Sequence, residues 1–96
     1  MVRYSVSFRI RHEREDGKVL CFGSDSKDFI SLGDSLSFLN ENYNDAAQRF
    51  NREGCLFLWS IFDFETGELF TGNLEVEYMK TFIDSVTSID LSQYKK

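Results

Sequence analysis

Apolar and polar residues alternate strictly at the start of the chain. The even-numbered positions from 2 to 10 are apolar, and the odd-numbered positions from 3 to 11 are arginine or serine. A period of two predicts a β-strand over residues 2–11 with one buried face and one polar face.

A turn follows at Glu15-Asp16-Gly17, which predicts a hairpin back to a second strand over residues 18–22. A three-residue loop ending in the glycine would pair Ile10 with Phe22 and His12 with Leu20. That register keeps the apolar side chains on the buried face. Residues 23–30 are mostly polar, so we expect a connection there.

Helical spacing replaces the alternation after residue 30. Ser31-Leu32-Gly33-Asp34 fits a capping box in which Ser31 caps the helix. The apolar stripe that follows consists of Leu32, Leu36, Leu39, Tyr43, Ala46, Ala47 and Phe50. Asparagines at 40, 42 and 44 are weak helix formers and predict a kink or break near residues 40–45. Gly54 is placed to end the helix in a left-handed conformation.

The most apolar segment of the chain is Cys55–Phe64. Its odd positions Cys55, Phe57, Trp59 and Ile61 and its even positions Leu56, Leu58, Phe62 and Phe64 are all apolar. Apolar residues on both faces are typical of a strand that is covered on both sides.

A second hairpin is expected after this segment, because Glu65-Thr66-Gly67 is again a turn sequence and residues 68–78 again alternate. A three-residue loop would set Phe62 opposite Phe70 and Leu58 opposite Leu74. A helix capped by Asn73 is the alternative for residues 72–79. Helical spacing after Met79 predicts a short second helix from about Lys80 to Ser88.

These elements predict one α+β domain over residues 1–96 in the order ββαββα, with residues 89–96 as a frayed tail. We expect a mainly antiparallel four-stranded sheet with the helices packed chiefly on one face. The pattern does not determine the strand order.

Unequal cover of the two faces of Cys55–Phe64 suggests an interface. We expect the long helix and the last strand to cover the even-numbered face, which leaves the odd-numbered face exposed. The candidate interface residues are Phe57, Trp59 and Ile61 on that face, with Arg9 and Arg11 from the first strand and Glu75 and Glu77 from the fourth as a charged rim. A rimmed apolar patch containing Trp is typical of a binding surface. The alternative is that the second helix, or curvature of the sheet, covers this face.

Composition narrows the classes of function. A formal net charge of −5 argues against direct binding of nucleic acid, which depends on releasing cations from phosphates. No apolar run approaches the length of a membrane span, and no secretory signal is evident, so a cytoplasmic protein with two reduced cysteines is expected.

No arrangement of reactive residues indicates an enzyme. His12 is the single histidine, and Cys21 and Cys55 lack the paired spacing of a zinc site, so structural roles are expected for all three. Phosphate-binding and calcium-binding motifs are also absent from the sequence. We therefore predict no catalytic residue, no metal ligand and no cofactor.

The leading hypothesis is a small, acidic, non-enzymatic protein–protein interaction module. By analogy of class with phage-encoded inhibitors and immunity proteins, it would occlude a partner such as a nucleic-acid-processing or defence protein. The first alternative is a homodimeric structural module that pairs through the aromatic strand. The second is a small-ligand-binding domain with a pocket between sheet and helix. The sequence does not identify the partner or the source of the protein.

Overall fold

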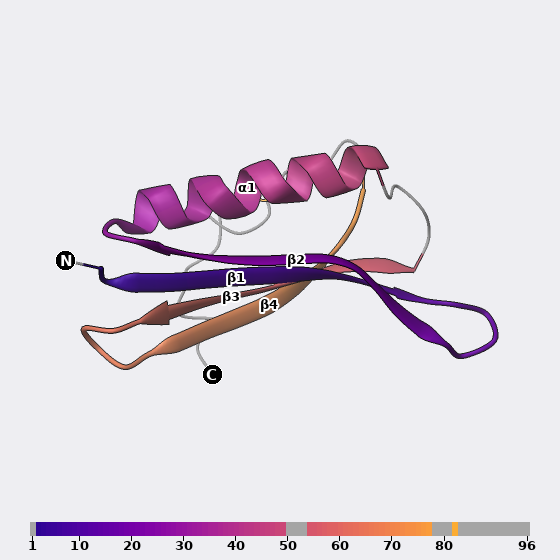
Figure 1. Cartoon of the computed structure of the whole chain (residues 1–96), viewed down its shortest axis with the longest axis horizontal. Coiled ribbons are helices and arrows are strands. Elements are labelled where there is room, and N and C mark those ends of the chain that lie inside the picture. Colours follow the sequence, from indigo (N-terminus) through magenta and orange to yellow (C-terminus); the bar gives the residue numbers. More distant parts are fainter. Residues whose placement is uncertain (1, 50–53, 78–81, 83–96) are drawn as a thin grey trace.

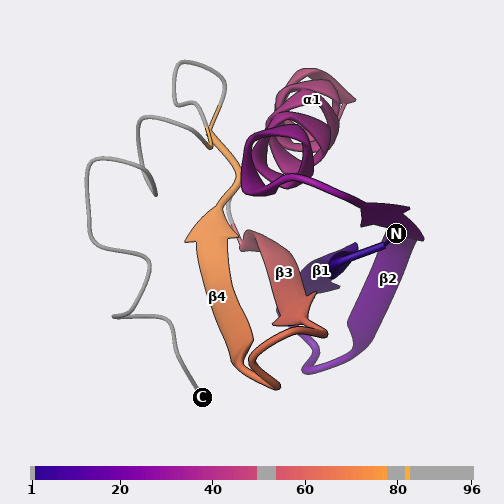
Figure 2. The same ribbon diagram turned by 90° about the vertical axis from the view of Figure 1, so that its left-hand side faces the viewer.

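The computed structural model describes residues 2–49, 54–77 and 82. The elements are β1 (Tyr4–Glu13), β2 (Val19–Phe29), α1 (Leu32–Arg49), β3 (Cys55–Asp63) and β4 (Leu69–Glu75). The strands form one antiparallel sheet in the order β2-β1-β3-β4, and α1 crosses one of its faces (Figures 1 and 2). The predicted α+β class and ββαββ order are confirmed. The predicted helix over Lys80–Ser88 lies outside the described residues except for Phe82, and so does the tail over 89–96.

The first hairpin has the predicted three-residue loop. Arg14 N donates to Lys18 O at 2.8 Å, Gly17 N donates to Arg14 O at 2.9 Å, and Gly17 has a φ of 84°. His12 pairs with Leu20 as expected. In Figure 1 this end of the hairpin projects past the C-terminal end of α1.

Two predictions for β2 are wrong. Ile10 pairs with Gly23 rather than Phe22, because Phe22 is an extra residue in a bulge between the two halves of the ladder. Residues 23–29 are not a connection, since they continue β2 alongside Tyr4–Ile10. An edge strand has solvent beside it and can be polar throughout, so its sequence lacks the alternation that marks a buried strand.

The long helix is capped and continuous. Ser31 Oγ accepts a hydrogen bond from Asp34 N at 3.1 Å, which confirms the predicted cap. α1 then runs unbroken from Leu32 to Arg49, so the expected interruption near residues 40–45 does not occur. Its buried apolar residues Leu39, Tyr43, Ala46 and Ala47 lie within the predicted stripe, and Ser35 is buried beside them. Packing against the sheet outweighs the weak helix propensity of the asparagines.

The β3–β4 hairpin confirms the predicted strand and excludes a helix capped by Asn73. Its register differs by one residue, with Leu58 opposite Asn73 and Phe57 opposite Leu74. The cause is a longer loop: Asp63 N donates to Glu68 O at 2.9 Å and Gly67 N donates to Asp63 O at 2.8 Å, which leaves four loop residues rather than three. A one-residue shift moves every side chain of β4 to the other face.

The core lies between α1 and the odd-numbered face of β3, so the predicted exposure of that face is wrong. Phe57 and Ile61 are 0% exposed and Trp59 is 3% exposed. The Phe57 ring lies 5.2 Å from Phe8 and 5.4 Å from Tyr43, and the Trp59 ring lies 5.4 Å from Phe82.

Pairing with β1 explains why the odd-numbered face of β3 is buried. Phe8 of β1 lies opposite Trp59, and Ile10 lies opposite Phe57. Residues that are opposite each other in a sheet share a face. One face of β1 is polar and faces solvent, so its apolar face packs in the core. Because the odd-numbered residues of β3 lie beside that apolar face, they are buried in the core as well.

Candidate interaction surface

The face of the sheet opposite α1 is called the outer face below. Its residues form four rows across β1, β3 and β4: Arg11–Leu56–Glu75, Arg9–Leu58–Asn73, Ser7–Ser60–Thr71 and Ser5–Phe62–Leu69. Ser7 Oγ and Ser60 Oγ are hydrogen-bonded at 2.6 Å, which shows that residues of one row lie on the same side of the sheet.

An apolar stripe runs along β3 on the outer face and is interrupted by Ser60. It consists of Leu56, Leu58, Phe62 and Leu69, all of them half-buried. None of the four belongs to the core packed under α1, and among the described elements no helix or strand covers them. Phe64, which is 55% exposed, extends the stripe at one end, and its ring meets the Phe62 ring edge-on with the centroids 5.2 Å apart.

Opposite charges flank this stripe. Arg9 and Arg11 lie beside it on β1, and Glu75 lies beside it on β4. Arg9 and Glu75 are exposed and Arg11 is half-buried. The ion pairs recorded within residues 2–49 and 54–77 involve other arginines, so these three charges remain available at the surface.

The structure thus separates the predicted interface residues into two groups. Arg9, Arg11 and Glu75 do flank β3, but they flank its even-numbered residues instead of Phe57, Trp59 and Ile61. Glu77 follows the end of β4 and is exposed outside the four rows. Sequence reasoning missed the apolar stripe, because the pairing of β1 with β3, which decides the face of β3 that is buried, is not evident from the sequence.

Tyr43 holds the acidic side of the outer face in place. Its hydroxyl donates to Glu75 O at 2.7 Å and accepts from Glu77 N at 3.2 Å, which ties the end of β4 to α1. Burial raises the pKa of the Tyr43 hydroxyl, with a smaller opposing effect from the hydrogen bond to the backbone of Glu77. The neutral phenol therefore persists and keeps donating.

An ion pair fixes the opposite end of the sheet. Arg3 Nε and a second guanidinium nitrogen donate to the two carboxylate oxygens of Asp63 at 3.2 and 3.1 Å. Asp63 Oδ1 also accepts from Glu65 N at 2.9 Å, which shapes the loop that carries Phe64. The hydrogen bonds from Arg3 hold the pKa of Asp63 below its usual value, although desolvation acts in the opposite direction.

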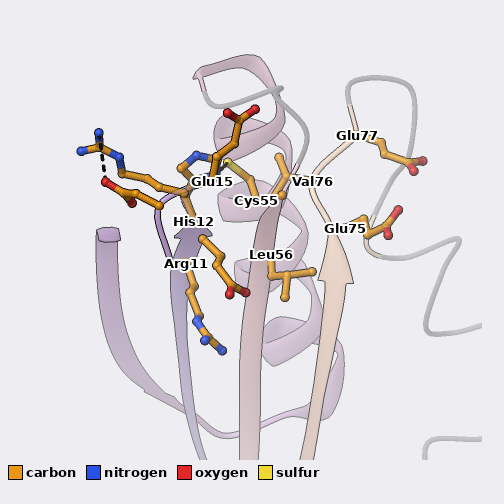
Figure 3. A pocket seen from close by; sticks show the side chains of 12 residues that line it. Arg11, His12, Glu15, Cys55, Leu56, Glu75, Val76 and Glu77 are labelled. Carbon is orange, nitrogen blue, oxygen red and sulfur yellow. Dashed lines mark hydrogen bonds and ion pairs between the residues drawn. The ribbon is translucent and has the colours of Figure 1, made fainter. Parts of the chain in front are cut away.

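A wide hollow of about 1280 Å³ lies at the end of the sheet where β3 begins. It is lined by the β1–β2 hairpin, the start of β3 and the end of β4, and Figure 3 shows its charged side chains. His12 Nδ1 lies 3.5 Å from Cys55 Sγ, as expected for opposite residues on β1 and β3. Cys55 itself is only 2% exposed.

The hollow offers little for metal chemistry. No group of three or more His, Cys, Asp or Glu side chains in the described part of the chain is placed to hold a metal ion. Cys21 is exposed on β2, opposite Arg11, and so lies on the other side of the sheet from Cys55. The two cysteines therefore do not form a joint site.

No protein-family model, curated protein or solved structure matches this chain. Within the described residues, no helix is both long enough and apolar enough to cross a membrane.

Proposed function

We propose that this chain is a non-enzymatic protein–protein interaction module and that the outer face is its interface. It would act as an inhibitor or neutralising protein by covering the working surface of a protein partner. The observation that carries the proposal is the half-buried apolar stripe of Leu56, Leu58, Phe62 and Leu69, flanked by Arg9 and Arg11 on one side and Glu75 on the other.

The composition of the outer face suits a protein ligand. Apolar side chains in the middle supply the area that is desolvated on binding, and charges at the margin supply orientation and rate. Positive and negative charges lie on opposite sides of the stripe, which favours a partner with a charged pattern of its own. A polyanion such as nucleic acid would be repelled by Glu75, across the stripe from the arginines, and by the net charge of −5.

Substitution at the centre of the stripe tests this function. Leu58→Asp places a charge in the middle of the outer face, and Arg9→Glu reverses a charge at its margin. We expect both variants to lose a partner that the wild type captures from cells of its source. Lys18→Glu is the matched control, because Lys18 is exposed in the β1–β2 turn, away from the stripe.

Near-ultraviolet circular dichroism and thermal unfolding show whether each variant keeps the native fold. Retention of the partner by correctly folded Leu58→Asp and Arg9→Glu would contradict the proposal. Trp59 is unsuitable for this test, since it is buried in the core and its truncation to alanine would destabilise the protein by about 3–5 kcal/mol.

A small-ligand site in the hollow is the second candidate function. It is favoured by the presence of His12 and several charged side chains around one cavity. A small molecule whose binding is weakened by His12→Ala and unchanged by Leu58→Asp would support this function over the first.

A further inference from the structure

We propose that the outer face binds a second copy of this chain, forming a dimer whose two-fold axis runs along β3 between the two sheets. This inference rests on the proposed function, in that it requires the outer face to be a protein interface. Binding of a different partner at the same face would compete with the dimer.

The order of the strands makes the outer face self-complementary. On the outer face β1 and β4 lie on either side of β3, with Arg11 and Glu75 as the two neighbours of Leu56 in the same row. A rotation of half a turn about an axis along β3 exchanges the two sides and keeps each row at its own height. Arg11 of one copy therefore lies opposite Glu75 of the other, and the reverse contact forms as well.

The same two-fold axis also sets the other residues of the outer face opposite defined residues of the second copy. Leu56, Leu58 and Phe62 each meet their own counterpart across the axis, and Leu69 lies opposite Ser5, so three of the four residues of the apolar stripe are covered by the stripe of the other copy. Arg9 lies opposite Asn73, which can accept a hydrogen bond from the guanidinium. Sheets stacked face to face in this way keep their strands roughly aligned, as in β-sandwiches.

A two-fold axis perpendicular to the strands is much less favourable than one along β3. An axis perpendicular to the strands would exchange the first row with the fourth. Glu75 would then lie opposite Leu69, and Arg11 would lie opposite Ser5. That arrangement buries charges without partners, which is strongly unfavourable. The charge pattern of the outer face thus favours the axis along β3 over the axis perpendicular to the strands.

Charge reversal tests the arrangement directly by sedimentation equilibrium over the micromolar to near-millimolar range. Arg11→Glu sets two carboxylates opposite each other at both symmetry-related contacts of the dimer, and Glu75→Arg sets two guanidinium groups opposite each other there. Either variant alone should raise the dimer dissociation constant at least about 100-fold. An equimolar mixture of the two variants should form a mixed dimer, because each contact in that dimer again joins a carboxylate to a guanidinium group.

The pairing in the mixed dimer follows from the symmetry. The Arg11→Glu copy carries two acidic groups in the first row, and the Glu75→Arg copy carries two basic groups there. Each acidic group of one copy therefore lies opposite a basic group of the other. Attraction replaces repulsion at both contacts.

A control pair with the same net charges separates this effect from general attraction. Lys18→Glu and Glu41→Lys change exposed residues of the β1–β2 turn and of α1, neither on the outer face. Each of these variants should dimerise as the wild type does, alone and in the mixture.

Three outcomes would overturn the inference: a monomeric wild type across the concentration range, dimers of unchanged affinity in both charge variants, or an equimolar mixture that stays monomeric. A monomeric wild type whose cellular partner is still lost in Leu58→Asp would refute the dimer and leave the proposed function intact. A dimer with the expected charge behaviour, together with a captured partner that still binds Leu58→Asp, would support the dimer and contradict the proposed function.

Discussion

Gly72 has a specific structural task because the Trp59 indole lies directly over it. A Cβ atom at Gly72 would lie 2.7 Å from Trp59 Cζ2 and 2.8 Å from Cε2, closer than non-bonded carbon atoms approach. Its φ is not among the positive values, so side-chain volume and not backbone conformation requires glycine here. The Trp59 indole, the largest side chain of the core, can pack in this position only because residue 72 on the neighbouring strand has no side chain.

Gly72→Ala should therefore destabilise the protein by about 1–3 kcal/mol, the usual cost of overpacking a core. Urea unfolding followed by Trp59 fluorescence measures the change. The matched control is Gly33→Ala, since a Cβ at Gly33 of α1 meets nothing within 4 Å. Alanine favours the helix over glycine, so this control should be neutral or stabilising. Equal destabilisation of the two variants would show that the indole does not pack on Gly72.

At the scale of elements, α1 shows how a local signal and long-range packing combine. Its start is set locally by Ser31, whose hydroxyl accepts from Asp34 N, and its course is set by burial of Leu39 and Tyr43 against the sheet. The cap and the stripe were both predicted from the sequence. The weak propensity of the asparagines was given too much weight, because burial of the apolar stripe stabilises the helix through the whole segment.

Ser31→Ala should lower the free energy of unfolding by about 1 kcal/mol, because Asp34 N then loses its acceptor at the helix N-terminus. Ser37→Ala provides the control, as Ser37 is exposed in α1, where alanine is the better helix former. Thermal unfolding by circular dichroism compares the two. A drop in stability for Ser37→Ala as large as for Ser31→Ala would argue against a capping role.

The two hairpins illustrate which element features can be predicted from local sequence. The first loop follows its turn sequence, and His12 pairs with Leu20 as expected. The second loop has similar chemistry but takes one more residue, because Asp63 binds both Arg3 and the backbone of Glu65. Arg3 is distant in sequence, so no reading of the turn alone could have found this register.

At the scale of the whole molecule, the Arg3–Asp63 pair makes stability depend on pH. It joins the start of the chain to the end of β3, and it keeps the pKa of Asp63 below its usual value. A carboxyl with a lowered pKa in the folded state stabilises the fold at pH values above its unfolded pKa of about 3.9. That stabilisation is lost as the pH falls through the folded pKa, so acid weakens the fold.

Asp63→Asn should reduce stability at neutral pH and should flatten the decrease below about pH 4. Urea unfolding at a series of pH values measures both effects. Asp28→Asn removes a carboxylate from an exposed residue of β2 outside this network and should keep the steepness of the wild type. A pH profile of Asp63→Asn parallel to the wild type would show that the ion pair does not contribute to acid sensitivity.

The position of the candidate interface was also decided at this scale. Arg9, Arg11 and Glu75 could be proposed from the sequence because exposed charges on alternating strands stand out. The apolar half of the interface could not, since Phe57 and Leu58 differ little in their local signals and only one of them can face α1. Prediction chose the odd-numbered face of β3, but the tertiary structure buries that face and leaves the even-numbered residues Leu56, Leu58 and Phe62 half-buried on the outer face.

The sequence by itself determined the elements up to β4, the cap of α1, the first turn and the buried face of β1, because each depends on nearby residues or on one clear alternation. Only the tertiary structure decided the strand order, the extension of β2, the register of β4 and the exposed face of β3. A strand that is apolar on both sides has no preferred face of its own. Its orientation came from pairing with β1, and that pairing placed Leu56, Leu58 and Phe62 on the surface that we propose as the interface.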